Sequence, residues 1–345
     1  MSESILPLRL RDILHVARRR GASDIHLMPG VAAAIRSDGV LQQLDGAALE
    51  PSETAALARM LLGERLAQAL PERRDVTSTW VDDTARAARV HAFYARDGVC
   101  LALRLLRDRV PELQTLGLPG AVNGFVGLER GLVIFAGPTG SGKSTSLAAL
   151  VEEINRSRAC RIVTVEDPVE YRYTSALAMI TQREVGADVA SFDAAVHGAL
   201  RADPDVLLIG EMRDPATMRA ALVAAETGHL VLTTLHTGTA AQTVDRIVDA
   251  FEGSEQSYVR AQLAQALTAV VCQRLVARAE RQGRRAVAEV LIVNDAVRTI
   301  IREGRTHQLR NAMVTARHEG MQTLEQHASE LVAGREIDSE VAAAL

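Results

Sequence analysis

The chain has 345 residues, a formal net charge of −4 and a hydrophobic content of 48%, which is enough for two cores in two domains. Its acidic balance and its aromatic content of 3% argue against a nucleic-acid binder, because such proteins usually show a basic face and stacking aromatics. The three cysteines are widely separated, which argues against a disulfide framework or a zinc site. No apolar run approaches the roughly 18 residues of a membrane span, and the N-terminus shows no signal pattern. We expect a cytoplasmic protein without direct membrane insertion.

The first 106 residues predict a small α+β domain. Residues 8–20 carry apolar side chains at helical spacing and end in three arginines and Gly21, the pattern of an amphipathic helix with its stop signal. The other predicted elements are a strand at 25–27, a hairpin over 34–44 around Asp38-Gly39, a helix over 52–69, and two or three strands over 76–106 with turns at Asp82-Asp83 and Asp97-Gly98. Residues 107–120 contain two prolines and two glycines and predict a linker.

Residues 121–345 predict a second domain with a different organisation. Apolar runs near residues 132, 162, 206 and 230 read as strands, with helical segments between them. Alternation of strands and helices is typical of an α/β domain with a mainly parallel sheet. We expect such a domain here.

A phosphate-binding loop is the most specific motif in the chain. Residues 137–144, GPTGSGKS, match the pattern G-x-x-x-x-G-K-[ST] in full, between an apolar strand at 132–136 and a helix at 144–155. In such a loop, backbone N–H groups converge on the β-phosphate, the lysine reaches the β and γ oxygens, and the serine hydroxyl ligates Mg²⁺. The alternative is a glycine-rich turn with an incidental lysine. The candidate ATP-binding residues are Gly137, Pro138, Thr139, Gly140, Ser141, Gly142, Lys143, Ser144 and Thr145.

Lys143 is the only lysine of the chain, and the other 38 of the 39 basic residues are arginines. An ammonium is a compact point charge, whereas a guanidinium is a planar fork. Its single use inside this loop indicates a site that requires the compact cation.

Acidic residues follow two of the predicted strands. Residues 206–209 run into Glu211, the form of a Walker B element, and such a carboxylate can support the Mg²⁺ shell through water or orient the attacking water. A second strand ends in the sequence EDPVE at 166–170, where three carboxylates could divide metal, water and base roles. The alternatives are a solvent-facing acid at Glu211 and a solvated acidic turn at 166–170.

Two histidines bracket the last predicted strand of this series. His229 precedes the apolar residues 230–232 and His236 follows them, each with hydroxyl neighbours. A lone histidine at such a place is more often structural. A pair at opposite ends of one strand suits a γ-phosphate sensor and the relay of its state.

Several sequence boxes together resemble one family. GPTGSGKS at 137–144, VEDPVE at 165–170, QREVG at 182–186, DPDVLLIGEMRD at 203–214, TGHLVLTTLHT at 227–237 and GMQTLE at 320–325 are similar to the retraction ATPases of type IV pili, within the secretion ATPase superfamily. GASDIHL at 21–27 and IRSDG at 35–39 resemble that family's N-terminal PAS-like domain. The resemblance implies a PAS-like N-terminal domain followed by a RecA-like ATPase domain, ATP with Mg²⁺, a ring hexamer, and removal of pilin at the inner membrane beside a platform protein.

The resemblance also assigns roles to individual residues. Glu170 matches the catalytic glutamate, Glu211 the Walker B glutamate, and His229 and His236 the two histidines of the His box. Arg104, and more weakly Arg89, fall where the family supplies a charge-stabilising arginine across a subunit boundary; the alternative for each is a surface ion pair. The family often has a further arginine at the position of Ala87, so the complete set of trans-acting arginines stays open.

Other functions remain as alternatives. Assembly ATPases of pili and type II secretion share these boxes but carry a long N-terminal extension and usually a four-cysteine zinc site, neither of which occurs in this sequence. Residues 296–303 resemble the C-terminal helix of retraction ATPases, with Ala296, Val297, Ile300 and Ile301 predicted on its apolar side. An accessory retraction ATPase, a RecA-like nucleic-acid translocase and a nucleotide-binding regulator without turnover are the remaining candidates.

Overall fold

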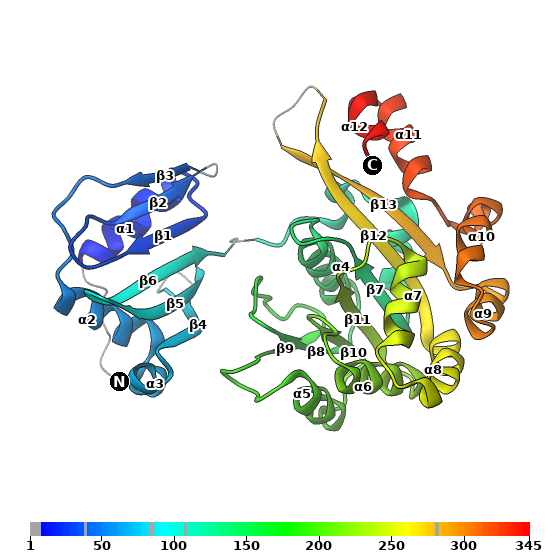
Figure 1. Cartoon of the computed structure of the whole chain (residues 1–345), viewed down its shortest axis with the longest axis horizontal. Helices are drawn as coiled ribbons and strands as arrows, with labels where there is room; N and C mark the ends of the chain where they lie inside the picture. Colours follow the sequence, from blue (N-terminus) through cyan, green and yellow to red (C-terminus); the bar gives the residue numbers. More distant parts are fainter. Residues whose placement is uncertain (1–7, 38–39, 83–85, 107–108, 280–282) are drawn as a thin grey trace. The chain divides into compact units, whose positions relative to one another are not determined.

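A computed structural model describes residues 8–37, 40–82, 86–106, 109–279 and 283–345. The chain is a mixed α/β protein of two compact units (Figure 1). The first unit comprises Met1–Arg109 with Pro168–Arg172, and the second comprises Val110–Asp167 with Tyr173–Leu345.

A six-stranded antiparallel sheet forms the first unit, in the order β3-β2-β1-β6-β5-β4. Its elements are α1 (Leu8–Arg19), β1 (Asp24–Leu27), β2 (Ala34–Ser37), β3 (Val40–Gln43), α2 (Pro51–Leu62), α3 (Glu64–Arg73), β4 (Asp75–Val81), β5 (Ala87–Ala95) and β6 (Gly98–Leu105). One face of the sheet packs with the helices into a core that includes Leu10, Ile25, Leu57 and Leu103. The helix predicted over 52–69 is two helices, because Gly63 adopts a φ of 74° between α2 and α3.

A seven-stranded sheet forms the second unit, in the order β13-β12-β7-β11-β10-β8-β9. Its strands are β7 (Gly131–Ala136), β8 (Arg161–Glu166), β9 (Met179–Glu184), β10 (Val206–Ile209), β11 (Leu230–Leu235), β12 (Leu267–Ala277) and β13 (Arg284–Ile292). All adjacent pairs are parallel except β12 with β13. The strands expected near residues 132, 162, 206 and 230 are confirmed and lie side by side.

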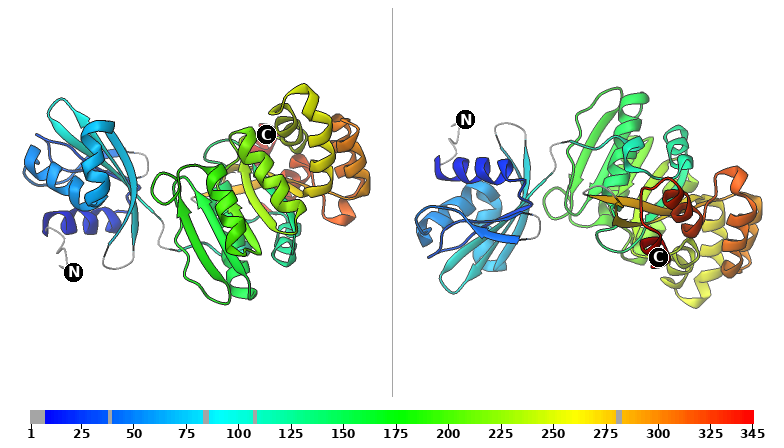
Figure 2. Two further views of the ribbon diagram at one scale, coloured as in Figure 1. Left: turned by 90° about the horizontal axis from the view of Figure 1, so that it is seen from below. Right: turned by 90° about the horizontal axis from the view of Figure 1, so that it is seen from above.

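Helices cover both faces of this sheet (Figure 2). They are α4 (Lys143–Ser157), α5 (Phe192–Ala199), α6 (Pro215–Glu226), α7 (Ala240–Asp249), α8 (Gly253–Ala266), α9 (Asp295–Arg302), α10 (Leu309–Thr315), α11 (Leu324–Ala333) and α12 (Ser339–Ala343), with 3₁₀ turns η1 (Leu113–Leu116), η2 (Gly120–Gly127), η3 (Leu200–Ala202), η4 (Thr306–Gln308) and η5 (Arg317–Glu319). Helix α4 packs on one face, and α5 to α8 pack on the other. Burial on both faces explains why the strands read as continuous apolar runs in the sequence.

Part of the predicted linker belongs to the second core. Leu113 is 2% exposed and packs with Val122, Phe125 and α4, and the short η1 and η2 turns hold it there. The turn residues Asp38-Gly39 of the predicted hairpin and Asp83 lie outside the described residues, whereas the two hairpin strands are present as β2 and β3. In the described parts of the chain, no helix is long and apolar enough to cross a bilayer.

Candidate nucleotide-binding site

The P-loop leaves the carboxyl end of the buried central strand β7 and leads into α4. All six residues of β7 are buried, and strands β12 and β11 flank it in parallel. Helix α4 begins at Lys143, so its first N–H groups and the positive end of its dipole face the loop. This strand, loop and helix arrangement is the context in which the motif binds phosphate.

Glycines permit the path of the loop. Gly137, Gly140 and Gly142 have φ values of 141°, 79° and 91°, a region that L side chains rarely adopt. A Cβ on Gly137 would also lie 2.3 Å from the Gln273 carbonyl oxygen, so two independent constraints require glycine there. Pro138, Thr139 and Gly140 form the exposed tip of the loop.

The Lys143 side chain is folded against the carbonyl side of the loop. The residue is 7% exposed, and its Nζ donates hydrogen bonds to the carbonyl oxygens of Gly137 at 2.8 Å and Pro138 at 3.0 Å. The Ser144 hydroxyl is on an exposed residue beside it, and Thr145 is half-buried. The Lys143 ammonium and the first N–H groups of α4 therefore lie close together at the P-loop.

A second group of side chains lies at the carboxyl ends of the parallel strands, where the P-loop also lies. It consists of Glu211, Arg213 and His236. Glu211 follows β10 and forms an ion pair with Arg213, whose Nη1 lies 3.4 Å from Asp167 Oδ2. His236 follows β11, which lies between β10 and β7, and its Nε2 is 3.4 Å from Glu211 Oε2. The strand order therefore places Glu211 and His236 at the carboxyl ends of the parallel strands, beside the P-loop, where α/β sheets bind their ligands.

The electrostatics of this edge act on His236. Partial burial, together with the cations Lys143 and Arg213, lowers the pKa of His236 below its usual value. This shift favours the neutral imidazole, which meets Glu211 as a dipole. A neutral ring beside a phosphate site can donate one hydrogen bond without adding charge.

The acidic turn after β8 splits into two parts. Glu166 is held inside the second unit, where its Oε1 accepts hydrogen bonds from Thr164 Oγ1 at 2.7 Å and Gln182 Nε2 at 3.1 Å. Glu170 is exposed and lies in the segment 168–172, which groups with the first unit. Its role as catalytic base stays a prediction.

His229 lies at the amino end of strand β11, whereas His236 lies at its carboxyl end. It precedes β11, and its carbonyl accepts from Gly131 N, the first residue of β7. With about 3.3 Å per strand residue, the two histidines are separated by roughly 20 Å. His229 Nδ1 is 2.9 Å from the Ala224 carbonyl oxygen, so the ring is fixed on the end of α6. The structure does not bring His229 to the P-loop, and its relay role stays a prediction.

Arg89 and Arg104 are cross-strand neighbours in the first unit. They are paired residues of β5 and β6, so their side chains leave the same face of the sheet, opposite the helices. Arg104 Nε also forms an ion pair with Asp24 Oδ1 at 2.9 Å. On its other side, Asp24 is the cross-strand neighbour of Arg36 in the register of β1 with β2. The ion pair expected as the alternative therefore exists for Arg104, within a row that carries three arginines.

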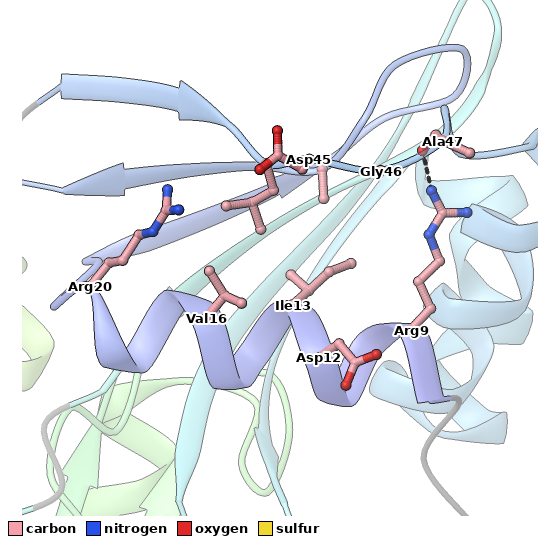
Figure 3. Close-up of a pocket in the computed structure, with 10 residues that line it drawn as sticks. Arg9, Asp12, Ile13, Val16, Arg20, Asp45, Gly46 and Ala47 are labelled. Atoms are coloured by element: carbon pink, nitrogen blue, oxygen red, sulfur yellow. Dashed lines mark hydrogen bonds between the residues drawn. The ribbon is translucent and has the colours of Figure 1, made fainter.

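A hollow in the first unit contains none of the predicted site residues. It has a volume of about 270 Å³ and lies between α1 and residues 44–47 (Figure 3). Arg9 at one end is bound to Glu53 and to the Ala47 carbonyl oxygen. Shape alone distinguishes this hollow, and it carries no functional assignment.

Gln273 on β12 contacts the P-loop but belongs to none of the sequence motifs. Its Nε2 donates to the Ser141 carbonyl oxygen at 2.7 Å, and the residue is 1% exposed. It lies 132 positions after Ser141, so no local pattern connects the two. Only the pairing of β12 with β7 brings them together.

The family pattern of type II/IV secretion system proteins matches residues 2–341, which is nearly the whole chain. The chain belongs to this family. Its identity to the type IV pilus retraction ATPase PilT of Pseudomonas aeruginosa is 38% over 324 residues, covering 94% of this chain and 94% of the relative. The Escherichia coli K12 protein YggR is 41% identical over 319 residues, covering 92% of this chain and 97% of its own length.

A solved structure agrees with these sequence matches. The crystal structure of the pilus retraction motor PilT with bound ADP has a TM-score of 0.89 and 41% identity, and the match covers 96% of this chain and 95% of that one. The resemblance to retraction ATPases is confirmed at the level of sequence and of fold.

Lys143→Arg keeps the charge, yet we expect it to lower ATPase activity by at least about a hundredfold, because a guanidinium is too wide for the buried place that the ammonium occupies. Steady-state phosphate release at saturating ATP measures the loss. Thermal unfolding of the variant serves as the control for folding. Turnover close to that of the unmodified protein would refute the requirement for a compact cation.

We expect Lys143→Ala to raise the pKa of His236, because one of the two cations that disfavour the imidazolium is removed. An NMR titration of the histidine side chains measures the change, with His236→Gln identifying the resonance. His229 serves as an internal reference, since its ring lies at the other edge of the sheet. An unchanged titration of His236 in Lys143→Ala would show that the two groups do not interact.

Proposed function

We propose that this chain is the ATP-hydrolysing motor of a type IV pilus retraction system. The observation that carries the proposal is the match to PilT over 94% of both chains, combined with a P-loop edge that holds Lys143, Glu211 and His236 together. Similarity to a retraction ATPase over its full length supports the same task, whereas a shared P-loop alone would support only nucleotide binding.

The P-loop, the residues near it and Glu170 divide the work of phosphoryl transfer. The P-loop amides and Lys143 bind and orient the phosphates of ATP, and Ser144 would hold Mg²⁺, with Glu211 supporting it through water. Mg²⁺ supplies charge neutralisation at the phosphates. Glu170 acts as the base that orients the attacking water, and His236 senses the γ-phosphate by turning its single N–H from Glu211 to the phosphate. His229, at the amino end of β11, relays whether the γ-phosphate is bound at the nucleotide site.

The proposal includes an assembly and a place in the cell. The first unit acts as a PAS-like domain and the second as a RecA-like domain, in a ring of six chains at the cytoplasmic face of the inner membrane. Arg104 and Arg89 stabilise the charge that develops during phosphoryl transfer in a neighbouring subunit, as an arginine supplied in trans does in other phosphoryl-transfer enzymes. The ring meets the membrane through a platform protein, which is consistent with the described helices being too short to span it.

Deletion of the gene tests the direction of force. We expect cells without it to carry more pili and to lose twitching motility, because assembly continues while retraction stops. Complementation with Lys143→Ala should not restore movement, whereas the unmodified gene should. Loss of surface pili in the deletion would instead identify an assembly ATPase, and normal pili with normal motility would leave the retraction proposal without support.

Mixing two inactive variants tests the shared site. Arg104→Ala lacks the proposed trans arginine, and Lys143→Ala lacks a functional P-loop, so mixed rings rebuild intact sites at some interfaces. We expect ATPase activity to reappear at intermediate ratios of the two variants. Analytical ultracentrifugation should show rings with six times the mass of the 37.1 kDa chain. Hexamers that stay inactive at every ratio would contradict a role of Arg104 across the boundary.

A further inference from the structure

The carbonyl groups of the P-loop need hydrogen-bond donors on the side away from the phosphate. When the N–H groups of a loop converge on an anion, its C=O groups point outward, and buried backbone carbonyls are rarely left without partners. Three loop carbonyls accept from side chains: those of Gly137 and Pro138 from Lys143, and that of Ser141 from Gln273.

The two donors differ in one respect. The Lys143 ammonium is also the group that nucleotide phosphates attract, so its bonds to Gly137 and Pro138 compete with phosphate binding. The Gln273 amide is on β12 and is 1% exposed, and its bond to Ser141 does not compete with the ligand. Of the side-chain donors to these loop carbonyls, Gln273 is the one that can act both with and without nucleotide.

Gln273 also contacts the loop at both of its glycine ends. The backbone carbonyl oxygen of Gln273 would lie 2.3 Å from a Cβ on Gly137. Its side-chain Nε2 would lie 3.0 Å from a Cβ on Gly142. The loop therefore passes over this residue at its start, its middle and its end. The backbone of Gln273 faces Gly137, and its side-chain amide faces Ser141 and Gly142.

The position of Gln273 has a cost in stability. In the part of the chain that the structure describes, its Oε1 and the neighbouring Ser141 Oγ are buried without a hydrogen-bond partner. Unsatisfied buried polar atoms are unfavourable, and an apolar side chain of the same size would avoid that penalty. Core packing alone does not explain a glutamine here, whereas the need for an N–H donor to the Ser141 carbonyl does.

We propose that Gln273 is a positioning residue that preorganises the P-loop for nucleotide phosphates. It does not touch the reacting atoms; it holds the loop backbone so that its N–H groups already converge before the ligand arrives. Preorganisation lowers the ordering cost that binding must otherwise overcome. The proposal rests on the ATPase function, because it concerns the same site.

Gln273→Met tests the proposal, since methionine has a similar length and no N–H group. We expect the Kd for ADP and the KM for ATP to rise about tenfold, while kcat at saturating ATP changes by less than about threefold, because a loss of ground-state ordering affects binding more than chemistry. Gln273→Glu provides a second variant of nearly the same shape, in which a carboxylate oxygen faces the Ser141 carbonyl. It should weaken ADP binding at least as much.

Gln262 offers a matched control. It is a second buried glutamine of the same unit, 7% exposed, with its Nε2 donating to Glu226 at 2.8 Å and its Oε1 without a partner among the described residues. Gln262→Met therefore removes the same kind of buried amide from helix α8, with a comparable effect on unfolding temperature. It should leave the ADP Kd and the ATP KM within about twofold of the unmodified protein.

The outcomes separate the possibilities. Weaker ADP binding in Gln273→Met and Gln273→Glu, with Gln262→Met unchanged, supports the positioning role. Equal ADP affinity in all folded variants overturns it, as does an equal loss in the Gln262 control, which would point to general destabilisation. If Gln273→Met does not fold, the ADP affinity of Gln273→Glu decides by the same criterion, and if neither folds, the role is structural and the proposal is wrong. Failure of the unmodified protein to bind ADP would contradict the ATPase function itself.

Discussion

The left-handed backbone at Gly137, Gly140 and Gly142 is the constraint on which the rest of the second unit depends. A loop that turns its N–H groups inward can exist only where side chains are absent at these positions and where neighbouring groups satisfy its outward carbonyls. Strand β7 delivers the loop to the edge of the sheet, α4 adds its N-terminal amides, and β12 closes the space behind it. The other groups of the site are arranged around the anion that this backbone can bind.

Charge is balanced around the loop by neighbours of opposite sign. Lys143 and Arg213 are cations near His236, and the carboxylates of Glu211 and Asp167 face Arg213. Between them, His236 is kept neutral by burial and by both cations. A site with this composition can accept a polyanion by exchanging partners, because the cations are already present and the carboxylates can turn to a metal ion or to water.

Local sequence patterns predicted the parts of this arrangement that depend on nearby residues. The P-loop, its strand and its helix are contiguous, and the four apolar strands are each visible as a run of buried residues. The break at Gly63 was missed because residues on both sides favour a helix, and only the positive φ of Gly63 separates α2 from α3. The prolines and glycines around Leu113 predict a linker, although Leu113 packs into the core.

Relationships across the sheet could not be predicted in the same way. Gln273 meets Ser141 only because β12 is added beside β7, and the strand order is a property of the whole fold. The placement of His229 and His236 at opposite ends of β11 is different, because the sequence already predicts it from the apolar run between them. The pairing of Arg89 with Arg104 depends likewise on the register of β5 with β6.

Strand β11 has a mechanical consequence for any signal between those two histidines. All six of its residues are buried, and it is bonded along both sides, to β7 and to β10. Sliding such a strand along its axis would break two ladders of hydrogen bonds at once, so the strand behaves as a stiff rod within the sheet. A change at the carboxyl end of β11, beside the P-loop, can then reach the amino end of β11 only as a tilt of the whole sheet or as movement of the loops at the two ends of the strand. A strand held in this way can move only together with the sheet around it.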